Sequence, residues 1–308
     1  MSRKSEKALK DAQAFLAANN TEGKSEDEIN EMLQNFINDH DQDMEDPLTE
    51  ETAKTADDFL ELAEDTTSKS KAEKYIKKAL ELEPDNIDAI SAAVDLEDEP
   101  MEYFRKLKEA LERSDKIMEQ QGFMGEDYIG NFWGVLETRP YMRLRMKYVD
   151  FLIDAGMYGA AAAEGEEMLR LSENDNLGVR YRLMHIYALL EQEEKALELH
   201  KKYDSNEETQ MLLPLSMLYF MKMDIEKAKE YLDRLSAANK DTKKFFAAVK
   251  KDKMDQYLDE FSSYGYQPFT IQELITEMME NAYLFTAAPL YTAWAYEQTR
   301  TSKKKKEE

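Results

Sequence analysis

The stretch KAEKYIKKALELEPDNIDAI, residues 71–90, decides the fold of this chain. Its small residue Ala72 is followed seven positions later by Ala79-Leu80 and, five positions after Ala79, by Pro84. Small residues let two helices approach closely, and a proline ends a helix because it lacks the backbone N–H and restricts the residue before it. Asp85-Asn86 follows the proline directly. The pattern therefore predicts a helix that stops at Pro84, before the next repeat begins.

The same arrangement returns along the chain. Weaker copies contain Ala110-Leu111, Ala161 with Met168-Leu169, Ala196 with Leu197, and Ala228 with Leu232. Ala161, Ala196 and Ala228 are 35 and then 32 residues apart, and a period near 34 residues is that of tetratricopeptide (TPR) helical hairpins. Gly and Pro are few, and Ala, Leu, Glu, Lys and Met dominate, as in helical chains. We expect an all-α fold, a TPR-like right-handed α-solenoid of helical hairpins.

Composition and periodicity divide the chain into six expected segments. They are an acidic helical N-terminal extension (1–46), TPR-like repeats (47–120), an aromatic Gly-rich insert (121–140), TPR repeats (141–240), a divergent helical C-terminal cap (241–300) and a disordered basic tail (301–308). Residues 25–67 hold 16 acidic residues against one lysine. The negative charge is therefore concentrated near the N-terminus.

The charge balance excludes several classes of function. The 308 residues include 41 Lys and Arg against 65 Asp and Glu, a net charge of −24. A chain this acidic repels nucleic acid backbones and anionic membrane surfaces. There is no cysteine, which excludes disulfides, zinc–thiolate sites and a cysteine nucleophile. No secretory h-region or membrane-spanning stretch is visible. We expect a cytoplasmic, bacterial protein without nucleic-acid or membrane partners.

No constellation in the sequence predicts catalysis or a cofactor. Glycine-rich phosphate loops and His-x-x-x-His pairs are absent from the sequence. Acids at the spacing of a calcium-binding EF-hand do occur, namely Asp39, Asp41, Asp43 and Glu50. However, Met44 stands where that loop needs glycine for its sharp turn. We therefore expect an acidic linker rather than a metal site. We expect His185 to be partly buried with its ring nitrogens hydrogen-bonded, rather than to act as a catalytic base.

Two blocks of sequence carry a resemblance to known proteins. The first is Gly130-Asn-Phe-Trp-Gly134 with Glu137-Thr-Arg-Pro-Tyr-Met-Arg143, and the second runs from Met168 to Tyr181. Together they resemble a group of TPR proteins that is distantly similar to suppressor of tumorigenicity 7. Here Ser172-Glu173 stands for the usual Asn-Pro and Leu177 for the usual Gln. Without the proline, the signal that ends the helix is weaker. The resemblance implies a helical-repeat interaction protein and no catalytic residues.

A basic island, defined as Arg139, Arg143, Arg145 and Lys147, is the most specific candidate site. Its members at i,i+4 share a helix face and repel each other unless an anion lies there. First helices of a TPR array line its concave surface, so Arg143 and Arg180 are expected to converge on a carboxylate or phosphate there. The candidate ligand-binding residues are Arg139, Tyr141, Arg143, Asn176, Arg180 and Tyr181.

Internal pairing is the alternative for these charges and stays open. Glu137, Asp150, Asp175 or the acidic N-terminal segment could satisfy the arginines, and the N-terminus could fold back onto the basic island as an autoinhibitor. The Met-rich stretch 211–223 is expected to pack between repeats or to line a peptide groove.

These patterns favour one function and leave a second open. The first is a noncatalytic protein–protein interaction module, a scaffold or adaptor that binds a peptide or partner helix on its concave face. The second is a peptide-sensing regulatory protein that acts through a protein partner.

Overall fold

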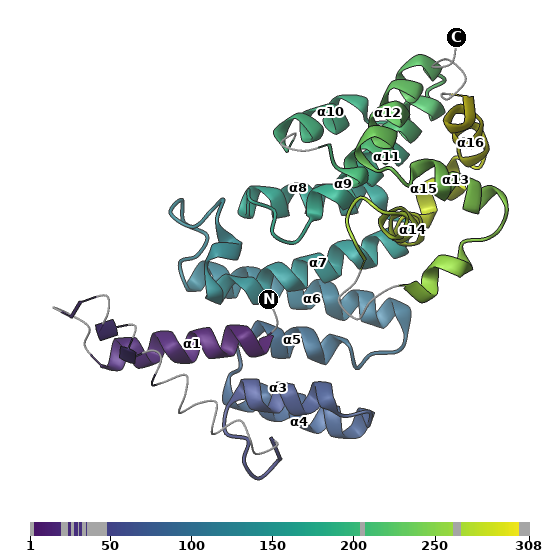
Figure 1. Cartoon of the computed structure of the whole chain (residues 1–308). Helices are drawn as coiled ribbons and strands as arrows, with labels where there is room; N and C mark the ends of the chain where they lie inside the picture. The colour runs from purple at the N-terminus through teal and green to yellow at the C-terminus, as the bar shows by residue number, and fades with distance from the viewer. Residues whose placement is uncertain are drawn as a thin grey trace. The chain divides into compact units, whose positions relative to one another are not determined.

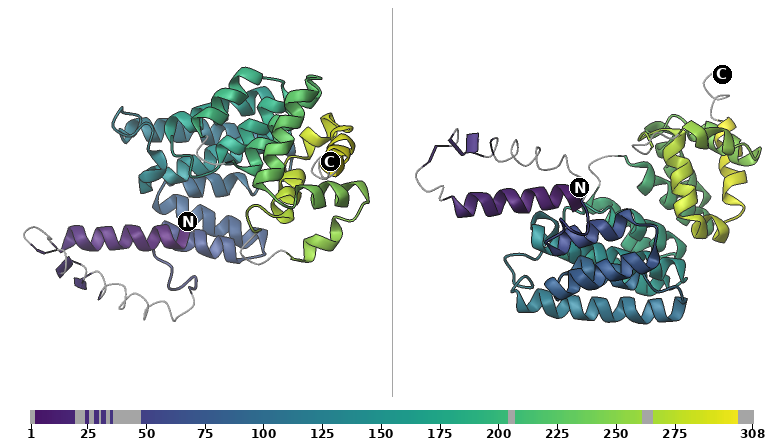
Figure 2. Two further views of the ribbon diagram at one scale, coloured as in Figure 1. Left: turned by 45° about the horizontal axis from the view of Figure 1, so that its top comes forward. Right: turned by 90° about the horizontal axis from the view of Figure 1, so that it is seen from below.

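The computed structural model describes residues 3–19, 24–25, 28–29, 31–32, 35, 48–203, 207–260 and 266–301. Within these ranges the chain is helical and has no strand apart from isolated bridges between Gly130-Asn131 and Ser172, which confirms the all-α class. The chain forms two compact units (Figures 1 and 2). Unit 1 comprises Met1–Phe151 with Arg170–Asn174, and unit 2 comprises Leu152–Leu169 with Asp175–Glu308. The expected basic tail lies outside the described residues, except for Thr301.

The elements of unit 1 are α1 (Arg3–Ala18), α3 (Ala56–Asp65), α4 (Lys69–Leu82), α5 (Ile87–Val94), α6 (Pro100–Gln120), the 3-10 helices η1 (Phe132–Gly134) and η2 (Leu136–Thr138), and most of α7 (Arg139–Asp154). In the first part of unit 1, α3 packs on α4, α4 on α5 and α5 on α6. Helix α4 ends at Leu82 and α5 begins after its N-cap Asn86, whose side chain accepts from Ala89 N. The predicted stop at Pro84 is confirmed.

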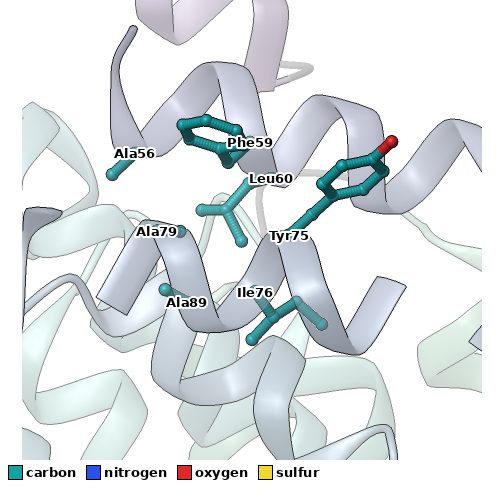
Figure 3. Close-up of a cluster of buried hydrophobic side chains, with 7 residues drawn as sticks. All are labelled: Ala56, Phe59, Leu60, Tyr75, Ile76, Ala79 and Ala89. Atoms are coloured by element: carbon teal, nitrogen blue, oxygen red, sulfur yellow. The ribbon is translucent and has the colours of Figure 1, made fainter. Parts of the chain in front are cut away.

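The core of the first hairpin explains the small residues in its sequence. Ala56 and Ala79 are fully buried where α3 packs on α4, and Phe59 and Tyr75 close the cluster (Figure 3). An alanine at each of these positions lets the two backbones approach closely, so a longer side chain there would force the helices apart. At the start of α3, Thr55 and Asp58 form a capping box.

Unit 2 contains the repeated part of the chain. Its elements are most of α8 (Tyr158–Leu171), α9 (Val179–Leu189), α10 (Glu193–Lys202), α11 (Thr209–Met221), α12 (Ile225–Ala238), α13 (Thr242–Lys250), the 3-10 helix η3 (Asp255–Glu260), α14 (Ile271–Glu280), α15 (Ala282–Ala287) and α16 (Tyr291–Thr301). Helix α9 packs on α10, α11 packs on α12, and α9 also packs on α11. Two helical hairpins therefore lie side by side through their first helices.

Three turns in unit 2 repeat one hydrogen-bonding pattern. In each, a residue with positive φ donates its N–H to the carbonyl three residues earlier, and the next residue donates to the carbonyl five residues earlier. The turns are Gly156-Met157, Glu191-Gln192 and Met223-Asp224, with φ of 70°, 53° and 62° at their first residues. Five residues beyond each lies a fully buried alanine, Ala161, Ala196 or Ala228. The predicted spacings of 35 and 32 residues thus coincide with a structural repeat.

Side chains repeat along with the turns. The hydroxyls of Tyr187 and Tyr219, 32 residues apart, each donate 2.9 Å to a glutamate, Glu166 and Glu193 respectively. Lys195 and Lys227, also 32 residues apart, pair with the same two glutamates and lie over the two tyrosine rings. The repeat therefore extends from the backbone to the contacts that join one helix pair to the next.

Helix α11 is the centre of unit 2. It packs against α9, α10, α12 and α14, and its side chains from Thr209 to Tyr219 are buried, apart from the half-buried Gln210. The Met-rich stretch therefore packs in the core as far as Tyr219, one of the two roles expected for it, and Met223 at its end is exposed. Helix α16 pairs with α13, and Trp294 contacts Phe220 and Tyr291.

Candidate functional site

Arg143 of the basic island is held by two carboxylates within unit 1. Its Nη1 lies 2.7 Å from Glu6 Oε2 on α1, and its Nη2 lies 2.8 Å from Asp88 Oδ2 on α5. Burial by itself would lower the pKa of Arg143, but Asp88 and Glu6 raise it above its ordinary value. The i,i+4 arginine pattern predicted an anion beside Arg143. Two carboxylates of the chain itself, those of Glu6 and Asp88, lie there.

Arg139, one helical turn before Arg143, faces the same glutamate. Its Nη1 lies 3.5 Å from Glu6 Oε1, its Nε donates 2.8 Å to the carbonyl of Trp133, and its guanidinium lies over the Trp133 ring. The two arginines therefore converge on one buried carboxylate. The N-terminal helix does fold back onto the basic island, through Glu6.

Tyr141, a further candidate on α7, points into the interior. It is fully buried, and its hydroxyl donates 2.6 Å to Asp115 Oδ1 on α6. Arg145 pairs with the same carboxylate at 3.0 Å and lies over the Tyr141 ring. The tyrosine hydroxyl is thus engaged within unit 1, and burial raises its pKa.

Arg180, Tyr181 and Asn176 lie in unit 2, around the start of α9. Arg180 Nη1 lies 3.0 Å from Asp175 Oδ2, and its guanidinium stacks 4.1 Å from the Tyr181 ring centre. The Tyr181 hydroxyl donates 3.1 Å to Glu208 Oε1, which also pairs with Arg180 at 3.4 Å. Asp175 caps α9 by accepting from the backbone N–H groups of Val179 and Arg180. Asn176 is exposed.

These contacts place both central arginines in internal ion pairs. Arg143 belongs to unit 1 and Arg180 to unit 2, and each has its own carboxylate partners within its unit. Of the internal partners expected from the sequence, Asp175 and the N-terminal segment are confirmed. Glu6, Asp88 and Glu208 were not predicted as individual residues. The convergence of Arg143 and Arg180 on one ligand stays a prediction.

In unit 2 a segment of the chain covers the first helices of the hairpins. Helix α14 packs against α13 and α11, and α15 packs against α9 (Figure 1). The segment thus runs back along the hairpins in the reverse of their sequence order. Polar contacts accompany it. Gln210 donates 3.0 Å to the Tyr266 hydroxyl, and Asn239 Nδ2 donates 3.0 Å to the Thr270 carbonyl. The Tyr283 ring lies 5.1 Å from the Tyr158 ring, centre to centre, at the beginning of the repeats rather than at their end.

A buried imidazole and carboxyl meet beneath this segment. His185 on α9 is fully buried, and its Nδ1 lies 2.8 Å from the Tyr181 carbonyl. A carbonyl can only accept, so Nδ1 carries the proton and Nε2 of the neutral ring does not. Nε2 lies 3.3 Å from Glu277 Oε2, within hydrogen-bonding distance although not in hydrogen-bonding geometry. The ring is more deeply buried than the sequence suggested.

Burial determines the charge of both groups. It lowers the pKa of His185 to about 4 and raises the pKa of Glu277 to about 8. At pH 7 the pair is therefore a neutral imidazole beside a protonated carboxyl, which is the less costly state in a dry interior. Arg182 acts to lower the pKa of Glu277, while Glu273 and Glu280 act to raise it.

The acidic stretch with EF-hand spacing lies mostly outside the described residues. Glu50 is described, and it pairs with Lys74 and Lys78, which together lower its pKa to about 2. Across the described ranges no group of three or more metal-ligating side chains is assembled. The same ranges contain no helix that combines the length and the apolar character needed to cross a bilayer.

Comparison with protein-family models and with curated proteins finds no match for this chain.

Proposed function

We propose that this protein is a noncatalytic interaction module, a cytoplasmic scaffold or adaptor built from TPR-like hairpins in a right-handed solenoid, that binds a peptide or helix of a protein partner. The repeated turns, buried alanines and tyrosine–glutamate contacts of unit 2 support the TPR-like part of the proposal. Such repeats leave a surface of similar helices that takes an extended peptide or a helix.

One observation carries the binding part of the proposal. The amphipathic helix α14 lies on α11 and α13 with Ile271, Leu274 and Ile275 buried against unit 2. Hairpin surfaces of this chain thus hold a helix by residues at i, i+3 and i+4, the pattern of helix-in-groove recognition.

The alternative is a regulatory protein that senses a peptide and acts through a protein partner. The fold-back of Glu6 onto Arg143 and Arg139 favours it, because a contact within the chain that occupies a charged site competes with any external ligand for that site.

The test is capture of partners by the intact chain, followed by calorimetry with the purified partner. A chain carrying Arg143→Glu and Arg180→Glu, shown to be folded by circular dichroism, serves as the variant. A chain carrying Lys116→Glu and Lys201→Glu, two exposed positions, is the charge-matched control. The proposal expects a saturable complex that the control retains. A reproducible turnover abolished by one conservative substitution would instead identify an enzyme.

A further inference from the structure

We propose that Arg139 and Arg143 form a carboxylate-binding site on unit 1, that Glu6 of α1 is its resident occupant, and that a partner helix carrying Glu followed by Lys replaces α1 there. The inference rests on the proposed function and names the partner class of that function. We call the site, made by Arg139, Arg143 and Asp58, the Glu6 seat.

The arginines of the Glu6 seat are held in place without help from α1. The backbone carbonyl and the ring of Trp133 fix Arg139. Asp88, near the start of α5, fixes Arg143 through two contacts, 2.8 Å from Nη2 and 3.3 Å from Nε. If α1 leaves, both guanidinium groups still direct donors toward the position of the Glu6 carboxylate. A site whose donors are preorganised binds an anion with less loss of side-chain entropy.

Glu6 fills the site incompletely. Its side chain is only 5% exposed, and Oε2 makes a 2.7 Å hydrogen bond to Arg143. Oε1 is buried without a hydrogen bond and lies 3.5 Å from Nη1 of Arg139. A buried oxygen that lacks a good donor is costly. A carboxylate presented at a slightly different angle would satisfy both arginines, so the seat can bind an external group more tightly than it binds Glu6.

The described side chains of α1 are mostly exposed or half-buried. Among its described side chains only Glu6 is buried, and Leu9 is 40% exposed. Its last turns extend beyond α3, α4 and α5 in Figures 1 and 2. A second contact joins Lys7 to Asp58, whose carboxylate also accepts from the backbone N–H groups of Lys54 and Thr55. Two consecutive charged side chains, Glu6 and Lys7, thus bind α1 to the rest of unit 1 through ion pairs.

These two anchors define the chemistry of the partner. The arginines select a carboxylate, and Asp58, fixed by the cap of α3, selects a cation one residue later. A helix with Glu followed by Lys satisfies both, as α1 does with Glu6-Lys7. A free phosphate would satisfy the arginines but not Asp58, which favours the helix as the occupant.

The experiment uses the full chain and a fluorescent peptide of residues 3–18 as the probe. The Glu6→Gln chain, with its own occupant weakened, should bind the peptide at least tenfold more tightly by anisotropy than the unmodified chain does. A peptide with Glu6→Gln, or a chain with both Glu6→Gln and Arg143→Gln, should lose this gain. The chain with Glu6→Gln and Lys116→Gln is the matched control and should keep it.

A second measurement follows α1 directly. The chain has no cysteine, so spin labels can be placed at Ala17→Cys and Lys77→Cys alone. Double electron–electron resonance should give one narrow distance that broadens in the Glu6→Gln background. Equal peptide affinity for the unmodified and Glu6→Gln chains would overturn the inference. So would tenfold tighter binding of inorganic phosphate than of the peptide, or a shift to dimers by exchange of α1 in light scattering.

The outcomes also separate this inference from the proposed function. A partner captured from extract that the α1 peptide does not displace would leave the interaction module standing and would reject the Glu6 seat as its binding site. Peptide exchange at the seat with no captured partner would support the site while counting against the wider function.

Discussion

Replacing Glu277 with glutamine should change the sign of the pH dependence of unit 2's stability. In the folded protein Glu277 is protonated, with a pKa of about 8, and His185 is neutral, with a pKa of about 4. In the unfolded chain both titrate near their ordinary values of 4.5 and 6.5. Stability depends on pH wherever the two states bind different numbers of protons.

The two groups act in opposite directions. The raised pKa of Glu277 means that the folded state holds a proton between about pH 4.5 and 8 that the unfolded state has released, so stability falls as pH rises. The lowered pKa of His185 means that the unfolded state holds a proton between about pH 4 and 6.5 that the folded state lacks, so stability rises with pH. From pH 4.5 to 6.5 these contributions cancel.

Above pH 6.5 only Glu277 contributes. The free energy of unfolding should then fall by ~1.4 kcal/mol per pH unit, or ~2 kcal/mol between pH 6.5 and 8. In the Glu277→Gln chain only His185 remains, so stability should rise up to pH 6.5 and then stay level. The glutamine amide can still donate to the unprotonated Nε2 of His185.

Urea unfolding at pH 5.5, 6.5, 7.5 and 8.5 measures these slopes. The chain has two tryptophans, Trp133 in unit 1 and Trp294 in unit 2. In a Trp133→Phe background, Trp294 fluorescence therefore reports unit 2. Glu226→Gln, which removes an exposed carboxylate of α12, is the matched control and should behave like the parent. Parallel curves for the parent and the Glu277→Gln chain above pH 6.5 would refute the neutral-pair argument.

Four further substitutions test the packing of unit 2 by thermal and urea unfolding. Met223→Gly should raise the free energy of unfolding by ~0.5–1 kcal/mol, because Met223 is exposed and has a φ of 62°. Gly156→Ala should lower the free energy of unfolding by ~1 kcal/mol, because Gly156 has a φ of 70°. Equal effects of the two changes would contradict the repeated-turn geometry. Ala196→Leu should cost ~1–3 kcal/mol, since its fully buried Cβ lies between packed helices, and a neutral result would show that α10 can move aside. Tyr291→Phe should cost ~1 kcal/mol, because the hydroxyl donates 2.9 Å to the buried Ser216; no loss would show that Ser216 is satisfied without it.

The sequence predicts the hairpins because their determinants are local. Ala161, Ala196 and Ala228 each lie within a few residues of the turn that they follow, and the Pro84 stop acts on its own neighbours. Helix propensity, caps and small-residue spacing all operate over less than one period. The class of the fold and the phase of its repeat can therefore be obtained without knowing any distant contact.

Partners of the basic island could not be predicted because they are distant in sequence. Glu6 is separated from Arg143 by 137 residues and Asp88 by 55. In a chain with 65 acidic residues, spacing does not select among candidate carboxylates. The i,i+4 repulsion showed that an anion was needed, and only the fold identifies which one lies there.

The packing of α14 and α15 back over the hairpins also could not be predicted from the sequence. Helical spacing in Leu274 and Phe285 indicates a buried face, but an amphipathic pattern specifies only that an apolar surface is needed and does not say which one. The expected cap at the end of the repeats is therefore only part of what residues 241–300 form.

The two occupied surfaces differ in how readily they can exchange. Helix α14 buries Ile271, Leu274 and Ile275 almost completely, and at about 1.5–3 kcal/mol per side chain this gives on the order of 5–9 kcal/mol before ordering costs. Displacing α14 to admit a partner would expose these residues and lose the free energy of their burial. Helix α14 is therefore a fixed part of unit 2. Among its described side chains, helix α1 instead buries the carboxylate of Glu6, and an incoming carboxylate restores the same ion pairs. Exchange of ligands is therefore expected at the Glu6 seat, where the replaced contact and the replacing contact have the same chemistry.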